Sequence, residues 1–109
     1  MDVNSILIAA LDTYSLDLRD HFKGDTVAIE NAISKCKDYL SHNTVTTDWV
    51  KRNWAIMSPA VKAYRKYLVD DIHHARIIED KEALEKLQAE YYILSPYIEL
   101  FKTFPKFLQ

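Results

Sequence analysis

Apolar residues recur every three or four positions along most of the chain, which is the spacing of one face of an α-helix. The first run consists of Leu7, Leu11, Tyr14, Leu18 and Phe22. The second consists of Ile29, Ile33, Cys36 and Leu40, and similar runs continue to residue 104. No segment alternates apolar and polar residues with period two over a useful length. The pattern therefore predicts an all-α fold, a compact bundle of four to six roughly antiparallel helices.

Residues that favour helix ends divide this pattern into segments. Gly24 is placed to end the first helix, and Asp25 or Thr26 can cap the second. Thr46 or Thr47 can cap a third helix, and Asp80 can cap the last. Pro105 is expected to end that helix. We thus expect a single helical domain over residues 1–104 and a short C-terminal tail over 105–109.

Two segments, IMSPAVKAYRKY from Ile56 and ILSPYIELFKTF from Ile93, share a Ser-Pro pair. Only Ile, Ser and Pro are identical between them, which favours two independent helix starts over a duplicated helix pair. Serine is a good N-cap and proline is tolerated at the first helical position, so each pair favours a new helix. The apolar stripe nevertheless stays in phase across each proline, and a helix kinked at Ser-Pro is the alternative.

Helix length bears on this choice. A continuous helix from Thr47 to Glu79 would be about 50 Å long and would project far beyond its neighbours, so we expect a break at Ser58. A helix from Lys81 to Phe104 would be only about 36 Å long. A single helix that is kinked at Ser95 would therefore still fit in a compact bundle.

The composition is that of an ordinary globular protein, with 49% apolar and 28% charged residues. Cys36 is the only cysteine, so an internal disulfide is excluded and a reducing compartment is favoured. The N-terminal apolar run is too short for a signal peptide, and no run approaches the ~20 residues that span a bilayer. We expect a cytoplasmic protein without a membrane partner.

The net charge of −2 hides a basic segment, because residues 51–76 hold six basic and two acidic side chains. On a helix from Pro59 to Glu79 the basic stripe faces away from the apolar positions, and it consists of Lys62, Arg65, Lys66, His73 and Arg76. Such a stripe can follow nucleic-acid phosphates, although most charged helix faces are simply solvated. Asp70 and the pI of about 6.0 weaken the nucleic-acid hypothesis. The sequence leaves open whether acidic residues of the first half cover the stripe, namely Asp12, Asp17, Asp20 and Asp25.

The C-terminal region is rich in aromatic residues, and part of it lies off the apolar stripe. Tyr92 and Ile93 point away from the stripe, while Phe107 and Leu108 follow the helix-ending proline. Aromatic side chains off the core face either pack on a neighbouring helix or form an interface with a partner.

Residue types that carry catalysis or bind metals are scarce in recognisable arrangements. Asp70 and His74 have the i, i+4 spacing of two ligands, but no second pair supports them, so we expect no metal and no cofactor. There is no phosphate-binding glycine loop and no nucleophile in a known setting. We therefore predict a non-catalytic interaction module of adaptor, inhibitor, immunity or mobile-element accessory type. It would bind a protein partner, or a second copy of itself, through Tyr92, Ile93, Phe107 and Leu108 or an exposed helix face; the alternative is nucleic-acid binding by the basic stripe.

Overall fold

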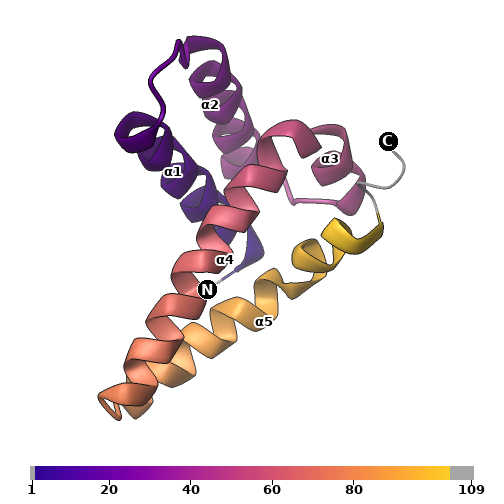
Figure 1. The fold of residues 1–109 in the computed structure, drawn as a ribbon. Coiled ribbons are helices and arrows are strands. Elements are labelled where there is room, and N and C mark those ends of the chain that lie inside the picture. Colours follow the sequence, from indigo (N-terminus) through magenta and orange to yellow (C-terminus); the bar gives the residue numbers. More distant parts are fainter. Residues whose placement is uncertain (1, 104–109) are drawn as a thin grey trace.

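The computed structural model describes the backbone of residues 2–103 and the side chains of residues 2–100. This part of the chain forms five helices and no strand: α1 (Val3–His21), α2 (Val27–His42), α3 (Thr47–Arg52), α4 (Trp54–Ile77) and α5 (Lys81–Thr103). The predicted all-α bundle is confirmed (Figure 1). The predicted helix end at Pro105 and the tail over 105–109 lie outside the described residues.

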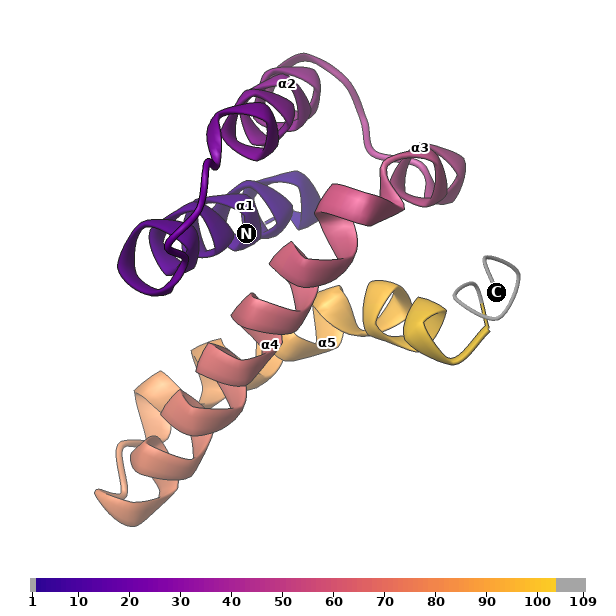
Figure 2. The same cartoon turned by 45° about the horizontal axis from the view of Figure 1, so that its top comes forward.

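Helix α4 is the centre of the bundle, because α1 packs on it from one side and α5 from another (Figure 2). Helices α1 and α2 form one antiparallel pair, and α4 and α5 form a hairpin whose tip projects from the rest (Figures 1 and 2). The radius of gyration of 14.5 Å exceeds the ~13 Å of a compact domain of this length, as a projecting hairpin requires. The largest fully buried side chains are Ile6, Leu7, Leu11, Val50, Met57, Val61 and Leu94.

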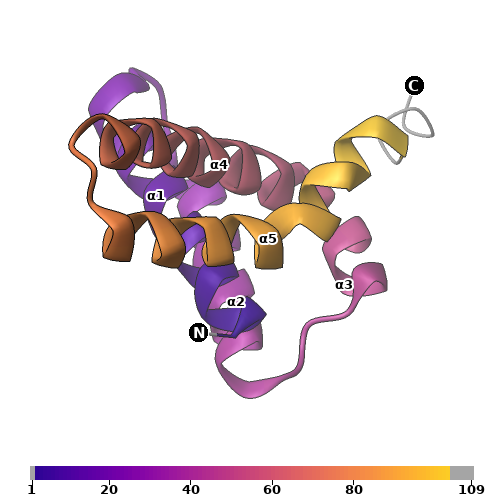
Figure 3. The ribbon, with the colours of Figure 1, turned by 90° about the horizontal axis from the view of Figure 1, so that it is seen from below.

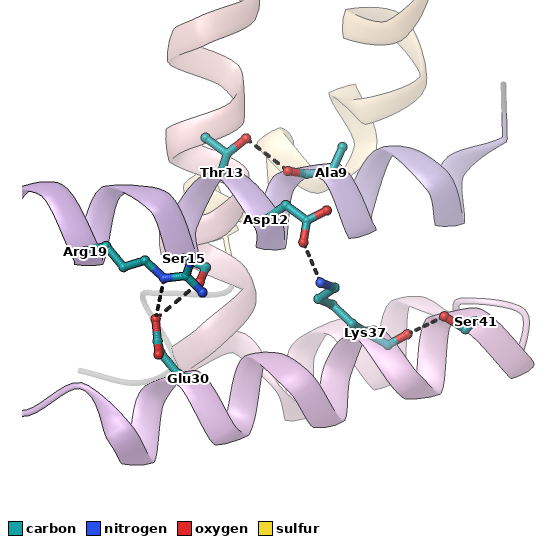
Figure 4. A network of polar contacts seen from close by, with 8 residues as sticks. All are labelled: Ala9, Asp12, Thr13, Ser15, Arg19, Glu30, Lys37 and Ser41. Atoms are coloured by element: carbon teal, nitrogen blue, oxygen red, sulfur yellow. Dashed lines mark hydrogen bonds and ion pairs between the residues drawn. The ribbon is translucent and has the colours of Figure 1, made fainter.

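Polar contacts join α1 to α2 at the surface (Figure 4). Asp12 pairs with Lys37, and Arg19 Nε lies 3.5 Å from Glu30 Oε1, which also accepts a hydrogen bond from Ser15 Oγ at 3.3 Å. Exposed ion pairs of this kind contribute about 0–1 kcal/mol each. Apolar packing is therefore the main force that holds the two helices together.

At three of the predicted helix starts, a residue named for the cap accepts a backbone hydrogen bond. The Thr46 side chain accepts a hydrogen bond from the backbone N–H of Trp49 at 3.1 Å, and Asp80 accepts one from Ala83 at 3.1 Å. At α2 the N-cap position is Thr26, but the side-chain acceptor is Asp25, which takes the N–H of Val27 at 2.9 Å. Asp25 thus supplies the side-chain hydrogen bond, and the Thr26 side chain makes no capping bond.

The end of α1 differs from the prediction. The helix stops at His21, because Phe22 has extended backbone dihedrals, and Phe22 is 51% exposed rather than part of the core. Gly24 has no positive φ and does not cap the helix. A Cβ at Gly24 would lie 2.6 Å from the Phe22 ring, so glycine there allows the ring to lie over the backbone.

The expected break at Ser58 is wrong, because the helix breaks at Asn53 instead. The Asn53 side chain donates to the carbonyl of Trp49 at 2.9 Å, which satisfies a group at the end of α3. Pro59 then lies within α4, in the second turn, where its missing N–H removes one helical hydrogen bond. The resulting α4 has 24 residues and matches the 23 residues of α5, so it does not project alone as the length argument assumed.

At Ser95-Pro96 the helix is continuous, and α5 changes direction in its last turns (Figure 3). Proline has no N–H to donate to the carbonyl of Tyr92, four residues earlier. Ser95 Oγ donates to that same carbonyl at 2.7 Å. The serine hydroxyl therefore replaces the hydrogen bond that the proline cannot make, which explains why the pair is tolerated inside a helix.

Both tryptophans flank the break between α3 and α4. Trp49 and Trp54 are almost fully buried. The Trp49 ring stacks on Tyr39 of α2, with ring centroids 4.6 Å apart and planes 6° from parallel. This stack joins the short helix α3 to α2, and neither of its two residues belongs to the α4–α5 hairpin.

The turn between α4 and α5 contains the one non-glycine residue with positive φ in the described chain, Glu79 at 58°. The N–H of Asp80 bonds to the carbonyl of Ala75 at 3.0 Å and that of Glu79 to Arg76 at 3.3 Å, which is the Schellman arrangement. Because glycine adopts this conformation without a Cβ clash, Glu79→Gly should raise the free energy of unfolding by about 0.5–1 kcal/mol. Urea unfolding followed by circular dichroism measures it, and Glu79→Ala, which keeps the Cβ, should show no such gain.

Candidate functional site: the groove between α4 and α5

The five residues of the predicted basic stripe share one exposed face of α4. Lys62, Arg65, Lys66, His73 and Arg76 are all exposed, while Val61, Leu68 and Ala75 on the opposite face are buried. Tyr64 and Ile72 are half-buried. Among the described residues, the side chains of Arg65, Lys66 and Arg76 form no ion pair.

The acidic residues of the first half are engaged elsewhere. Asp12 pairs with Lys37, and Asp25 caps α2. Asp17 accepts a hydrogen bond from the Tyr67 hydroxyl at 3.2 Å, on a different face of α4, and Asp17 with Asp20 raises the pKa of Tyr67. The stripe is therefore open to solvent rather than covered by the acidic half.

A groove of about 560 Å³ lies between α4 and α5, towards the projecting end of the hairpin. Helix α4 contributes Val69, Ile72, His73 and Arg76, and α5 contributes Gln88, Tyr91, Tyr92 and Ser95. The groove thus brings together two sites predicted separately from the sequence, the end of the basic stripe and the off-stripe aromatic residue Tyr92.

Apolar side chains form much of the groove, although it is open to water. Tyr92 is 79% exposed and Val69 is 43% exposed, while Ile72 and Tyr91 are half-buried. An exposed patch of large apolar side chains between two helices is typical of a surface that contacts another molecule. The sequence analysis did not identify Val69 as a candidate site residue. Its position nevertheless indicates an exposed apolar side chain, because Val69 lies within the basic stripe, three residues after Lys66.

A buried carboxylate lies between the same two helices. Glu90 of α5 is only 8% exposed, and its Oε1 accepts a hydrogen bond from the Tyr64 hydroxyl of α4 at 3.1 Å. Burial, together with the negative charge of Glu90, raises the pKa of Tyr64 to about 12. The pair is a polar link inside the hairpin and does not line the groove.

Of the other predicted interface residues, Ile93 is described and does not line the groove. Ile93 is half-buried and packs against the hydrophobic core. Phe107 and Leu108 lie outside the described residues. Tyr92 is thus the predicted aromatic residue that the described chain places on an open surface.

Other candidate chemistry is sparse. Between residues 2 and 100, no three His, Cys, Asp or Glu side chains come together as a metal site requires, and Asp70 and His74 are both exposed. Cys36 is buried, and burial raises the pKa of its thiol, which keeps it protonated at neutral pH. In the described part of the chain, no helix is both long and apolar enough to cross a bilayer.

Comparisons with protein-family models, with curated protein sequences and with solved structures find no significant match to this chain.

Proposed function

We propose that the protein is a non-catalytic interaction module that binds a protein partner in the groove between α4 and α5. The observation that carries this proposal is the exposed apolar surface of Tyr92 and Val69 beside Arg76. Tyrosine and arginine are enriched among the residues that dominate binding energy at protein interfaces. Their proximity on a projecting hairpin offers a partner both apolar area and charge.

A small-molecule ligand fits the groove less well. Small-molecule sites commonly enclose 70–90% of the ligand surface. Although a volume of 560 Å³ is in the usual range, a wall residue that is 79% exposed leaves that side open to water. A macromolecule can fill the groove and also cover the exposed side of Tyr92.

The proposal predicts site-specific crosslinking from position 92. A photoreactive phenylalanine analogue in place of Tyr92 should give discrete protein adducts in the cells that make the protein, because a partner would cover that ring. Arg76→Glu in the same chain should reduce those adducts by tenfold or more, since it reverses a charge in the groove. The analogue at Leu16, which is 55% exposed on α1, is the matched control. Equal adduct patterns at positions 92 and 16 would contradict the proposal.

Nucleic-acid binding is the second candidate, and the exposure of all five stripe residues favours it. Filter binding of a labelled DNA duplex and of single-stranded RNA at low and high salt tests it. Phosphate contacts predict a loss of about 0.9 log units in affinity per log unit of salt for each contact on duplex DNA. Arg65→Glu/Lys66→Glu should then abolish binding, while Lys86→Glu on α5 should leave it nearly unchanged. No binding at low salt eliminates this candidate.

A further inference from the structure

The lining of the groove has the regular spacing of two helical stripes. Val69, Ile72, His73 and Arg76 stand at i, i+3, i+4 and i+7 on α4, and Gln88, Tyr91, Tyr92 and Ser95 repeat that spacing on α5. Positions with this spacing form one continuous ridge along a helix. Two antiparallel helices with adjacent ridges leave a straight groove, which is the shape into which a third helix packs.

The length of the groove matches a short helical segment. On each wall the first and last lining residues are seven positions apart, which corresponds to about 10 Å along the helix axis, or two turns. A partner helix would therefore place about three side chains into the groove, one turn apart. Val69, Ile72 and Tyr92 provide apolar surface for these side chains.

The charges of the two walls are unequal, and this difference specifies the partner. The α4 wall carries the basic side chains of His73 and Arg76. The α5 wall is uncharged, with Gln88 and Ser95 as its polar members, and no carboxylate lines the groove. A partner helix is thus complementary if it is acidic on the flank that faces α4 and neutral on the other flank.

We infer that the groove binds an amphipathic helix of a partner protein, whose apolar ridge packs on Val69, Ile72 and Tyr92 and whose acidic flank faces Arg76. This inference rests on the proposed function and adds the chemical class of the partner. In this inference Arg76 determines which charge is preferred on the partner flank. Reversal of the Arg76 charge should therefore invert that preference.

A phage-displayed library of helical peptides tests the inference. Leucine is fixed at three positions one turn apart, and both flanks are randomised among Glu, Gln and Lys. Selection on the wild-type protein should enrich Glu on one flank only. Selection on Arg76→Glu should enrich Lys at those same positions. The affinity of the best peptide for the Tyr92→Asp variant should be at least tenfold weaker than its affinity for the wild-type protein. Its affinity for the Leu16→Asp variant should equal that for the wild type.

Three outcomes would overturn the inference: no enrichment, enrichment without a charged flank, or a flank preference that Arg76→Glu leaves unchanged. A dimer of the wild-type protein that Tyr92→Asp dissociates in sedimentation analysis would also overturn it, because a second copy would then occupy the groove. If one of the first three outcomes occurs, adducts to another protein from position 92 in cells would still support partner binding. Absence of those adducts would instead contradict the proposed function itself.

Discussion

Replacement of Leu94 by alanine should lower the free energy of unfolding by about 2–5 kcal/mol. Leu94 is fully buried in the core, one residue before Ser95-Pro96. Removal of its side chain loses apolar burial and leaves a cavity that the helices around it cannot fill without moving. Urea unfolding followed by circular dichroism gives the value directly.

The matched control is Leu16→Ala, which removes the same atoms from a side chain that is 55% exposed. It should change the free energy of unfolding by no more than about 0.5 kcal/mol. Similar costs at Leu94 and Leu16 would mean that α5 does not pack on the core at this position.

The second large effect is expected at the buried pair of Tyr64 and Glu90. Tyr64→Phe removes the hydroxyl that donates to the Glu90 carboxylate at 3.1 Å, and a buried acceptor without a partner costs about 1–3 kcal/mol. The double variant Tyr64→Phe/Glu90→Leu should recover most of that loss, because no polar group is then left unsatisfied. A double variant as unstable as Tyr64→Phe alone would contradict this account.

The same pair predicts a pH dependence. The pKa of Tyr64 in the folded protein, about 12, lies above its ordinary value of 10.0, so folding favours the protonated phenol. The stabilisation is therefore complete below about pH 10 and is lost as pH rises towards 12. The stability difference between wild type and Tyr64→Phe should be constant below about pH 10 and should shrink between about pH 10 and about pH 12. A constant difference over that range would show that the phenol is not the group responsible.

The periodic pattern predicted most of the fold, because burial of a helix face depends on local spacing. Leu7, Leu11 and Leu40 were all placed on core stripes, and all are buried. Phe22 was placed wrongly since the pattern does not show where the chain leaves the helix. The position of a helix end depends on backbone dihedrals that a neighbour such as Gly24 permits but does not impose.

The Ser-Pro pairs show a different limit. Cap preferences describe what Ser and Pro favour at a helix start, but the same residues are compatible with a helix interior when another donor replaces the missing N–H. At Ser95 that donor is the serine hydroxyl itself. For α4 the deciding residue was Asn53, five positions before Ser58, which no apolar pattern singles out.

The groove could be predicted only in part. Tyr92 and the basic stripe were identified from their positions relative to the core face. Their proximity depends on how α4 and α5 rotate about their own axes in the hairpin, and this rotation is set by contacts distant in sequence, such as that of Tyr64 with Glu90. Val69 and Gln88 become groove residues only through that rotation.

The positions of the two indole rings determine what optical spectroscopy can report on this protein. Trp49, stacked on Tyr39, and Trp54 are both shielded from water, so exposure on unfolding should strongly change their intrinsic fluorescence. Neither ring lines the groove between α4 and α5. A partner that binds there should leave tryptophan emission almost unchanged. The native chain thus carries its own fluorophores for denaturation, whereas binding requires an added dye near position 92.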